Sequence, residues 1–317
     1  MTRIGYFLSS EDWRPQQLIE QATAAEQAGF EALWLSDHYH PWNDEQGQSA
    51  FVWSVIGALS QRSTLPVTTA VTCPTLRIHP AVIAQAAATS AVLLDGRFIL
   101  GVGSGEALNE HIFGDAWPSA DVRLEMLEES IEVIRKLWEG GFTDHRGRHY
   151  KVENARIYTR PDSPPPIYIS AFGPKAVEVA ARVGDGFIST TPDADLVKSW
   201  RDAGGGNKPA QAGYKVCWAP DEAAARRTAH TLWPNAGLPG ELSQVLPSPR
   251  HFEQASTLVT EDMVAESILC GNDVKAHVAR MQAFVDAGYD EVYVNQVGPE
   301  HDGFFEFYAE HVLPELR

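Results

Sequence analysis

The feature that most constrains the fold is one unit that recurs along the chain. A short apolar run typical of a strand is followed by a stretch whose apolar residues have helical spacing; the first such pair occupies residues 3–8 and 15–30, and Gly29 ends it. The eight apolar runs lie at residues 3–8, 31–36, 65–71, 97–103, 165–171, 185–191, 213–219 and 290–298. Eight strands, each followed by a helix, predict an α/β fold of the (β/α)8 TIM-barrel type. A doubly wound sheet is the main alternative.

Two stretches interrupt this alternation. Residues 139–165 alternate in the manner of a hairpin, and residues 232–254 are rich in proline and glycine. Neither resembles an independent domain, and 317 residues suit one barrel with additions. We therefore expect a single domain over residues 1–317. The two stretches are expected to be insertions at the carboxyl-terminal face, as lids or dimer contacts.

Charge and cysteine content limit the partners and the cellular compartment that the sequence is compatible with. Lys and Arg number 25 against 42 Asp and Glu, and the formal net charge of -17 disfavours nucleic acids and anionic membranes as partners. No segment has the length of a signal-peptide core or a membrane span, and Cys73, Cys217 and Cys270 have no spacing typical of zinc, redox or disulfide sites. The sequence predicts a cytoplasmic protein that acts on a small molecule.

Polar residues cluster where the predicted strands end. In a parallel barrel these ends form one mouth, where the chemistry gathers. The candidates there are Glu11 after the first strand, Asp37, His38 and Trp42 after the second, and Glu106 and Asn109 after the fourth. A loop histidine with satisfied hydrogen bonds is the alternative reading of His38.

Other motifs at the mouth are less specific. His38 and His40 lack the further ligands that a metal site needs, so we predict no metal. The run GVGSGE lacks the third glycine of a dinucleotide fingerprint, and its glycines indicate either a tight turn or backbone that a flat ligand can approach. A Gly-Pro pair that opens a helix, with Lys175 in its first turn, predicts a phosphate site.

Four segments together resemble a known superfamily. They are SDHYHPW (36–42), VTCPTLRIHPAVIAQAAAT (71–89), FILGVGSGEALNE (98–110) and IYISAFGPKAVEVAARVGDGFIST (167–190). In order and spacing they are similar to the luciferase-like flavin and deazaflavin barrels, especially the branch of F420-dependent glucose-6-phosphate dehydrogenases. The resemblance implies a homodimer that binds coenzyme F420, an 8-hydroxy-5-deazaflavin, at the mouth of the barrel.

The resemblance also implies roles for individual residues. His38, Trp42, Glu11 and Glu106 fall on the active-site positions of the family. The coenzyme-binding positions fall on Asp37, Ala70, Val71, Cys73, Ser104, Gly105, Asn109, Phe172 and Gly173. Ala70, Cys73 and Phe172 replace a serine, a threonine and a glycine of family members. The family pattern further implies a cis peptide bond between Ala70 and Val71.

The implied reaction is hydride transfer between the coenzyme and an alcohol, carbonyl or enone. A neutral His38 would be the general base, and Glu11 would orient it. Trp42 would donate a hydrogen bond to the developing oxyanion, and Glu106 would protonate the coenzyme's pyrimidine edge or balance charge there. The alternatives are an FMN-dependent monooxygenase of the same superfamily, with FMN in place of F420, and a noncatalytic flavin-binding barrel.

The substrate is expected to differ from glucose-6-phosphate. Asp193, Ala265 and Glu266 fall where basic residues would clamp a phosphate, and the two acids would repel a dianion. Trp13, Trp42 and parts of residues 232–254 are expected to form the walls of the substrate site. Apolar walls with local negative charge favour a neutral or cationic substrate.

Overall fold

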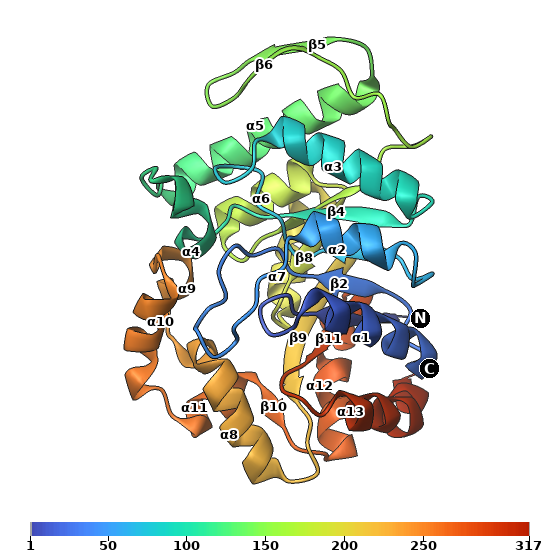
Figure 1. Cartoon of the computed structure of the whole chain (residues 1–317), viewed down its shortest axis with the longest axis vertical. Coiled ribbons are helices and arrows are strands. Elements are labelled where there is room, and N and C mark those ends of the chain that lie inside the picture. Colours follow the sequence, from blue (N-terminus) through green and yellow to red (C-terminus); the bar gives the residue numbers. More distant parts are fainter. Residues whose placement is uncertain (1, 317) are drawn as a thin grey trace.

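A computed structural model describes residues 2–316 and shows a closed parallel barrel with helices around it (Figure 1). The barrel strands are β1 (Arg3–Leu8), β2 (Leu33–Leu35), β3 (Val67–Thr69), β4 (Phe98–Val102), β7 (Ile167–Ser170), β8 (Gly186–Ser189), β9 (Ala210–Cys217) and β11 (Glu291–Gln296). Neighbours pair in that order, and β11 pairs with β1 to close the ring. The predicted TIM barrel is confirmed, and closure excludes the open doubly wound sheet.

Helices follow the strands as predicted. They are α1 (Pro15–Ala28), α2 (Val52–Leu59), α3 (Pro80–Leu93), α4 (Ala107–Glu110), α5 (Ala120–Glu139), α6 (Pro174–Val183), α7 (Ala194–Trp200), α8 (Glu222–Leu232), α12 (Val274–Asp286) and α13 (His301–Phe307). The predicted alternation of one helix after each of eight strands does not include α4 or α12. The buried face of α12 includes His277, which contacts the Tyr308 hydroxyl and the Gly271 carbonyl and weakens the apolar pattern.

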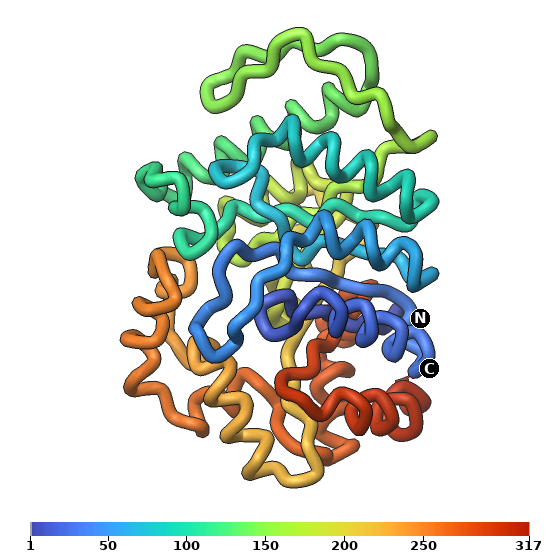
Figure 2. The backbone as a smooth tube through the Cα atoms, in the orientation of Figure 1, coloured from blue at the N-terminus to red at the C-terminus, as the bar shows by residue number. Residues whose placement is uncertain are grey.

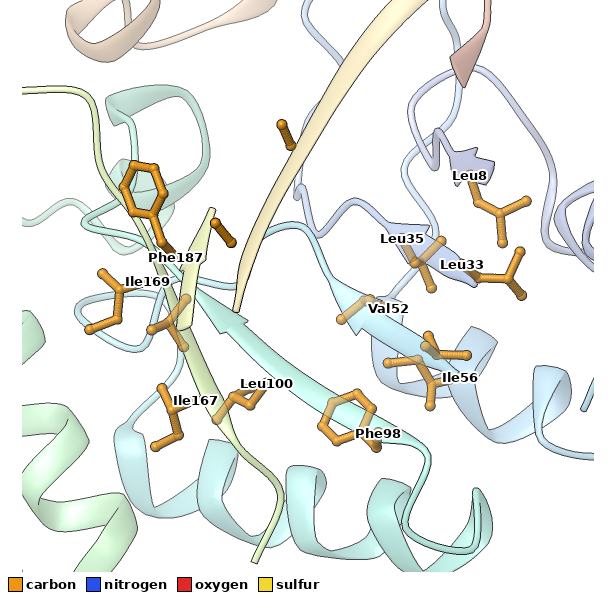
Figure 3. Close-up of a cluster of buried hydrophobic side chains, with 14 of the residues drawn as sticks. Leu8, Leu33, Leu35, Val52, Ile56, Phe98, Leu100, Ile167, Ile169 and Phe187 are labelled. Atoms are coloured by element: carbon orange, nitrogen blue, oxygen red, sulfur yellow. The ribbon is translucent and has the colours of Figure 1, made fainter. Parts of the chain in front are cut away.

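The main core lies between the strands and the helices. Outward-facing Leu33, Leu35 and Leu100 of the strands share one cluster with Val52 and Ile56 of α2, as Figure 3 shows. These side chains are fully buried. Burial of this kind stabilises a fold by about 25 cal/mol per Å² of apolar surface removed from water.

Large rings fill the inside of the barrel. Trp34 stacks on Tyr293 with 4.5 Å between ring centroids, and its indole N–H donates to Gln211 Oε1 at 2.8 Å. A Cβ at Gly213 would lie 2.2 Å from the Trp34 ring, so this position needs glycine. The packed interior closes the barrel below its mouth, which leaves the strand ends as the place for a ligand.

The first insertion differs from expectation in its position. Strands β5 (Thr143–Arg146) and β6 (Lys151–Ala155) form an antiparallel hairpin that lies beside α5 on the outside of the barrel (Figure 1). His145 Nε2 is 3.1 Å from Glu129 Oε1 of α5. The hairpin joins the end of a helix to the next strand, so the chain enters it from the amino-terminal side. It therefore covers the helix layer rather than the carboxyl-terminal face.

The second insertion lies against the mouth. It contains η3 (Pro234–Gly237), α9 (Leu242–Val245) and α10 (Pro249–Ala255), followed by η4 (Ser256–Leu258), α11 (Glu261–Ser267) and the short strand β10 (Leu269–Cys270), which pairs with β9. Asn43 of the loop after β2 donates to the Leu232 carbonyl at 3.0 Å, and the Asp44 N–H donates to Glu253 at 3.1 Å. Figure 2 shows this segment in orange, next to the blue loop. Among residues 2–316, no helix combines the length and apolarity needed to cross a membrane.

Candidate active site

Three loops bring His38 between two carboxylates. His38 follows β2, and its Nδ1 lies 3.4 Å from Glu11 Oε1 of the loop after β1. Its Nε2 lies 3.1 Å from Glu106 Oε1 of the loop after β4. The three side chains are 11%, 2% and 26% exposed, so the imidazole can be reached while Glu11 cannot. The ends of β1, β2 and β4 thus assemble the acid–base group that the sequence places there.

This arrangement decides the charge of His38. Burial alone would lower its pKa, but Glu11 and Glu106 outweigh burial and raise the pKa of His38 to about 9. Burial would raise the pKa of Glu106, and contact with His38 lowers it below its ordinary value instead. At neutral pH His38 is therefore an imidazolium, which differs from the neutral imidazole expected from the sequence. The sequence does not show that two carboxylates would lie within ion-pair distance of one ring.

Two serine hydroxyls hold the carboxylate of Glu11 on the side away from His38. Ser9 Oγ and Ser36 Oγ lie 2.8 and 2.7 Å from its Oε2, which leaves Oε1 for His38. The carboxylate is almost fully buried, so these hydroxyls replace its hydration. Glu11 can therefore orient and charge the imidazole but cannot contact a ligand.

Trp42 forms a wall beside His38. Its ring centroid lies 5.1 Å from that of His38 and 5.0 Å, edge to face, from that of Phe252 in α10. The second insertion thus reaches the site through Phe252. Trp13 instead contacts His301 at 4.5 Å, at the start of α13.

Asp37 is committed to contacts within the chain. Its side chain has no exposed surface; Oδ1 lies 2.9 Å from an Arg77 nitrogen, and Oδ2 accepts from the Thr72 hydroxyl. Arg77 also approaches Glu110 Oε1 at 3.5 Å, and its backbone N–H donates to Glu110 Oε2 at 2.8 Å. Asp37 therefore supports the loop, and any contact with a coenzyme would have to come from its backbone.

Asn109 is also a supporting residue. Its Oδ1 accepts from the backbone N–H groups of Tyr39 and His40 at 2.8 and 3.1 Å, and its Nδ2 donates to Glu106 Oε1 at 3.1 Å. The side chain is buried. It fixes the His38 loop and Glu106 relative to one another.

Bare backbone forms a shelf next to these charges. The Ala70–Val71 peptide is cis, as predicted. Gly105 has φ 79°, and a Cβ there would lie 2.5 Å from the buried Cys73 Sγ. A Cβ at Gly103 would lie 2.8 Å from Val71 Cγ2. Side chains larger than hydrogen do not fit at either glycine, so the surface stays low and open to a flat ring.

The predicted phosphate turn is exposed. Gly173 precedes the first turn of α6, and a Cβ added to it would meet nothing within 4 Å. Phe172 is 48% exposed, and Lys175 Nζ is 2.7 Å from Asp121 Oδ1. Open space before the first N–H groups of a helix suits an anion, and Ser104 lies half-buried after β4 on the shelf side.

Among residues 2–316, the positions predicted to face the substrate hold acids and no cluster of cations. Asp193 caps α7, accepting from two backbone N–H groups, and Glu266 is exposed in α11. Lys198 pairs with Asp202 near the end of α7, and Lys208 donates to the carbonyls of Ala181 and Gly184 just before β8, so both lie towards the amino-terminal ends of the strands. These lysines are therefore already engaged within the chain.

Two other features lie away from this site. Cavities of about 350 and 570 Å³ are lined by residues near Thr2 and Asp290 and by α5 with the hairpin, respectively. Neither cavity includes His38 or the shelf, so the site is identified by its charged side chains and bare backbone rather than by a cavity. In the described part of the chain, no three metal-ligating side chains form a group that could hold a metal ion.

Comparison with known proteins assigns the barrel to a family. The profile described as luciferase-like monooxygenase matches residues 1–291. The chain belongs to this luciferase-like family. The match spans every strand of the barrel up to the first residue of β11, and thus all the loops that build the site.

Relatives of this luciferase-like chain are known from several sources. It is 34% identical over 330 residues to the F420-dependent glucose-6-phosphate dehydrogenase of Amycolatopsis mediterranei, covering 100% of this chain and 99% of that one. It is 35% identical over 324 residues to the F420-dependent hydroxymycolic acid dehydrogenase of Mycobacterium tuberculosis, covering 99% and 88%. A solved F420-dependent secondary alcohol dehydrogenase, in complex with an F420-acetone adduct, matches with a TM-score of 0.91 and 30% identity, covering 100% and 99%.

Sequence reasoning missed three groups in this luciferase-like site. Arg77 is a charged residue within an apolar segment, and this charge is the signal that could have identified it as part of the site. Asp12 directly follows Glu11 in the sequence. Lys215 Nζ lies 4.1 Å from the Trp233 ring centroid and 5.4 Å from that of Phe7. Burial lowers the pKa of Lys215, although Glu11 and Asp12 oppose this effect.

Proposed function

We propose that this chain is an F420-dependent dehydrogenase that exchanges a hydride with a small uncharged secondary alcohol or the corresponding ketone. The observation that carries the proposal is His38, held between Glu11 and Glu106 beside the bare shelf. The relatives that match nearly the whole chain are F420-dependent dehydrogenases, and the solved alcohol dehydrogenase supports the substrate class.

The residues present fit the coenzyme. Ala70, Val71, Ser104 and Gly105 form the shelf for the flat ring, because their backbone is not covered by large side chains. The N–H groups after Gly173 would bind the phosphate. When bound, F420 supplies a carbon that accepts or donates hydride.

His38 exchanges the proton that accompanies the hydride. In ketone reduction, the imidazolium donates its proton to the carbonyl oxygen as the alcohol forms. In alcohol oxidation, His38 must first lose that proton and then accept the one from the hydroxyl. Glu11 and Glu106 both favour the charged ring, so the resting state is prepared for ketone reduction. Trp42 lies beside the ring and limits access of water.

Charge excludes phosphate esters from the proposed substrates. The substrate side offers Asp193 and Glu266 but no cluster of unpaired cations among the described residues. A dianion near one exposed carboxylate loses about 1 kcal/mol of binding free energy. An uncharged alcohol has no such penalty and can pack against Trp42 and Phe252.

Coenzyme reduction tests the proposal. Purified protein is mixed with F420 and with a panel that contains 2-propanol, 2-butanol, cyclohexanol and glucose-6-phosphate, and the absorbance of the oxidised coenzyme is followed. Saturable turnover with an uncharged secondary alcohol, and none with millimolar glucose-6-phosphate, is expected. A parallel titration with FMN distinguishes the coenzymes. Tight FMN binding without F420 binding, or robust glucose-6-phosphate turnover, would overturn the proposal.

We further propose a cytoplasmic homodimer. The three cysteines are free thiols, in keeping with a reducing compartment. Phe51, at the start of α2, and Val82, Val92 and Leu93 of α3 are apolar and exposed, which suits a second copy of the chain. Sedimentation equilibrium of the purified protein tests the dimer, and a mass of one chain at micromolar concentration would contradict it.

A further inference from the structure

A second carboxylate lies behind the pair formed by Glu11 and His38. Asp12 Oδ2 is 2.9 Å from Ser9 Oγ, and Ser9 Oγ is 2.8 Å from Glu11 Oε2. The indole N–H of Trp233, which follows α8, donates to the same Asp12 oxygen at 3.0 Å. A continuous set of hydrogen-bond-length contacts therefore runs from Asp12 through Ser9 and Glu11 towards His38.

The contacts among Asp12, Ser9 and Glu11 require one more proton than two ionised carboxylates and a serine hydroxyl provide. The Ser9 hydroxyl has one hydrogen and can donate to one carboxylate at a time. If both acids were ionised, the other contact would join two oxygen lone pairs at less than 3 Å. Ser36 also donates to Glu11 Oε2, so Ser9 and Ser36 together satisfy an ionised Glu11. The additional proton then belongs on Asp12.

The surroundings of the two acids support this assignment. Glu11 faces His38, and ionised Glu11 gains from that cation. Asp12 has one oxygen, Oδ1, that is buried without a hydrogen-bond partner among the described residues. An ionised carboxylate with a bare buried oxygen is unfavourable, whereas a neutral acid tolerates it better.

We propose that Asp12 is a positioning residue: it carries a proton on Oδ2 and donates it to Ser9, so that Ser9 donates to Glu11 and Glu11 stays ionised against His38. The groups that act on Asp12 are Glu11 and Ser9 on its own loop, Lys215 of β9 and the Trp233 indole. Asp12 in turn acts on Tyr6 of β1.

The proton on Asp12 is lost within the physiological range. Burial and the neighbouring charge of Glu11 raise the pKa of Asp12 to about 7, although Ser9, Trp233 and Lys215 oppose them. Above this pH a second negative charge appears behind Glu11, and both acids compete for the Ser9 hydrogen. The imidazolium form of His38 is then stabilised further, and release of its proton becomes harder. Asp12 thus sets how readily His38 changes charge. The link to turnover rests on the proposed function, but the titration does not.

The test follows the imidazole of His38 directly. Protein labelled with 13C at histidine Cε1 is titrated by NMR without coenzyme or substrate, and the signal is assigned among the 11 histidines by its loss in His38→Asn. Two inflections are expected for His38: one near pH 7 from Asp12 and one near pH 9 from the ring itself.

Two variants separate this role from a structural one. Asp12→Asn should remove the lower inflection and move the upper one down by roughly 0.5 to 1 pH unit, because no second charge develops. Trp233→Phe removes a donor to the carboxylate and should move the lower inflection to higher pH. Asp44→Asn, at an exposed carboxylate on the His38 loop, should leave both unchanged.

The outcomes are decisive in each direction. A single inflection in the wild type, or a lower inflection that persists in Asp12→Asn, would overturn the proposal. If Asp12→Asn does not fold, an unmoved lower inflection in Trp233→Phe would do the same. The expected titration in a protein that oxidises no alcohol would preserve this inference and reject the proposed function. With an active substrate, the change in kcat/KM near pH 7 that Asp12 causes in the wild type should be absent in Asp12→Asn.

Discussion

The two halves of the barrel mouth hold their charges differently. At the ends of β1 to β4, Glu11, Asp37 and Arg77 are buried, His38 is 11% exposed, and the four side chains form the pairs His38–Glu11 and Arg77–Asp37. At the ends of β8 and β9, Asp193 is exposed, and the pair of Arg227 with Asp221 faces solvent. The first half is preorganised and suits the chemical step. The second half has few fixed contacts and is where selectivity can change.

The largest expected effect tests the chemistry of the first half. His38→Ala should lower kcat by about 10² to 10⁴, the usual contribution of a general acid or base, and leave coenzyme affinity within a few fold. Stopped-flow rates and a coenzyme titration measure the two quantities. His40→Ala is the matched control, because its Nδ1 contacts the Leu108 carbonyl at 3.0 Å; it should keep most of the activity. A wild-type rate in His38→Ala would mean that the proton comes from elsewhere.

The next effect tests whether burial makes the first half rigid. Arg77→Met would leave Asp37 and Glu110 buried without their cation and should lower the free energy of unfolding by about 3 to 5 kcal/mol. Arg227→Met, in the exposed pair with Asp221 in the second half, should change it by at most about 0.5 kcal/mol. Urea denaturation compares them. Equal losses would erase the distinction between the halves.

The sequence predicted the barrel more completely than the site. Strand and helix periods are local properties, so all eight strands could be located, and chain order placed Glu11, His38 and Glu106 at one end. The protonation of His38 depends on distances across three loops, and the burial of Asp37 depends on Arg77, which is 40 residues later in the chain. The protonation of one residue and the burial of the other are thus set by tertiary contacts, which a local sequence pattern does not show. The position of the hairpin beside α5 likewise follows from packing rather than from its alternating pattern.

A smaller effect concerns pH and stability. The pKa of His38 rises from an ordinary value near 6.5 to about 9 on folding. Its contribution, about 3 kcal/mol at most, is therefore fully present below pH 6.5 and is lost as pH rises through 9. The difference in unfolding free energy between wild type and His38→Asn should thus be larger at pH 6 than at pH 10. A difference that does not depend on pH would show that folding leaves the pKa of His38 unchanged.

The smallest expected effect tests the second half. Asp193 contributes a negative charge and also caps α7, and asparagine is an equally good cap, so Asp193→Asn removes the charge and keeps the helix start. If this carboxylate repels a phosphate ester by about 1 kcal/mol, inhibition by glucose-6-phosphate should strengthen by about fivefold. The KM of an uncharged alcohol should stay constant, because it has no charge to repel. Steady-state inhibition at low and high salt measures both, and screening should shrink the gain. An equal change for both ligands would mean that Asp193 acts on the shape of the loop. The charge of the half-buried Lys215, which Glu11 and Asp12 offset, would then be the next determinant of phosphate selectivity to test.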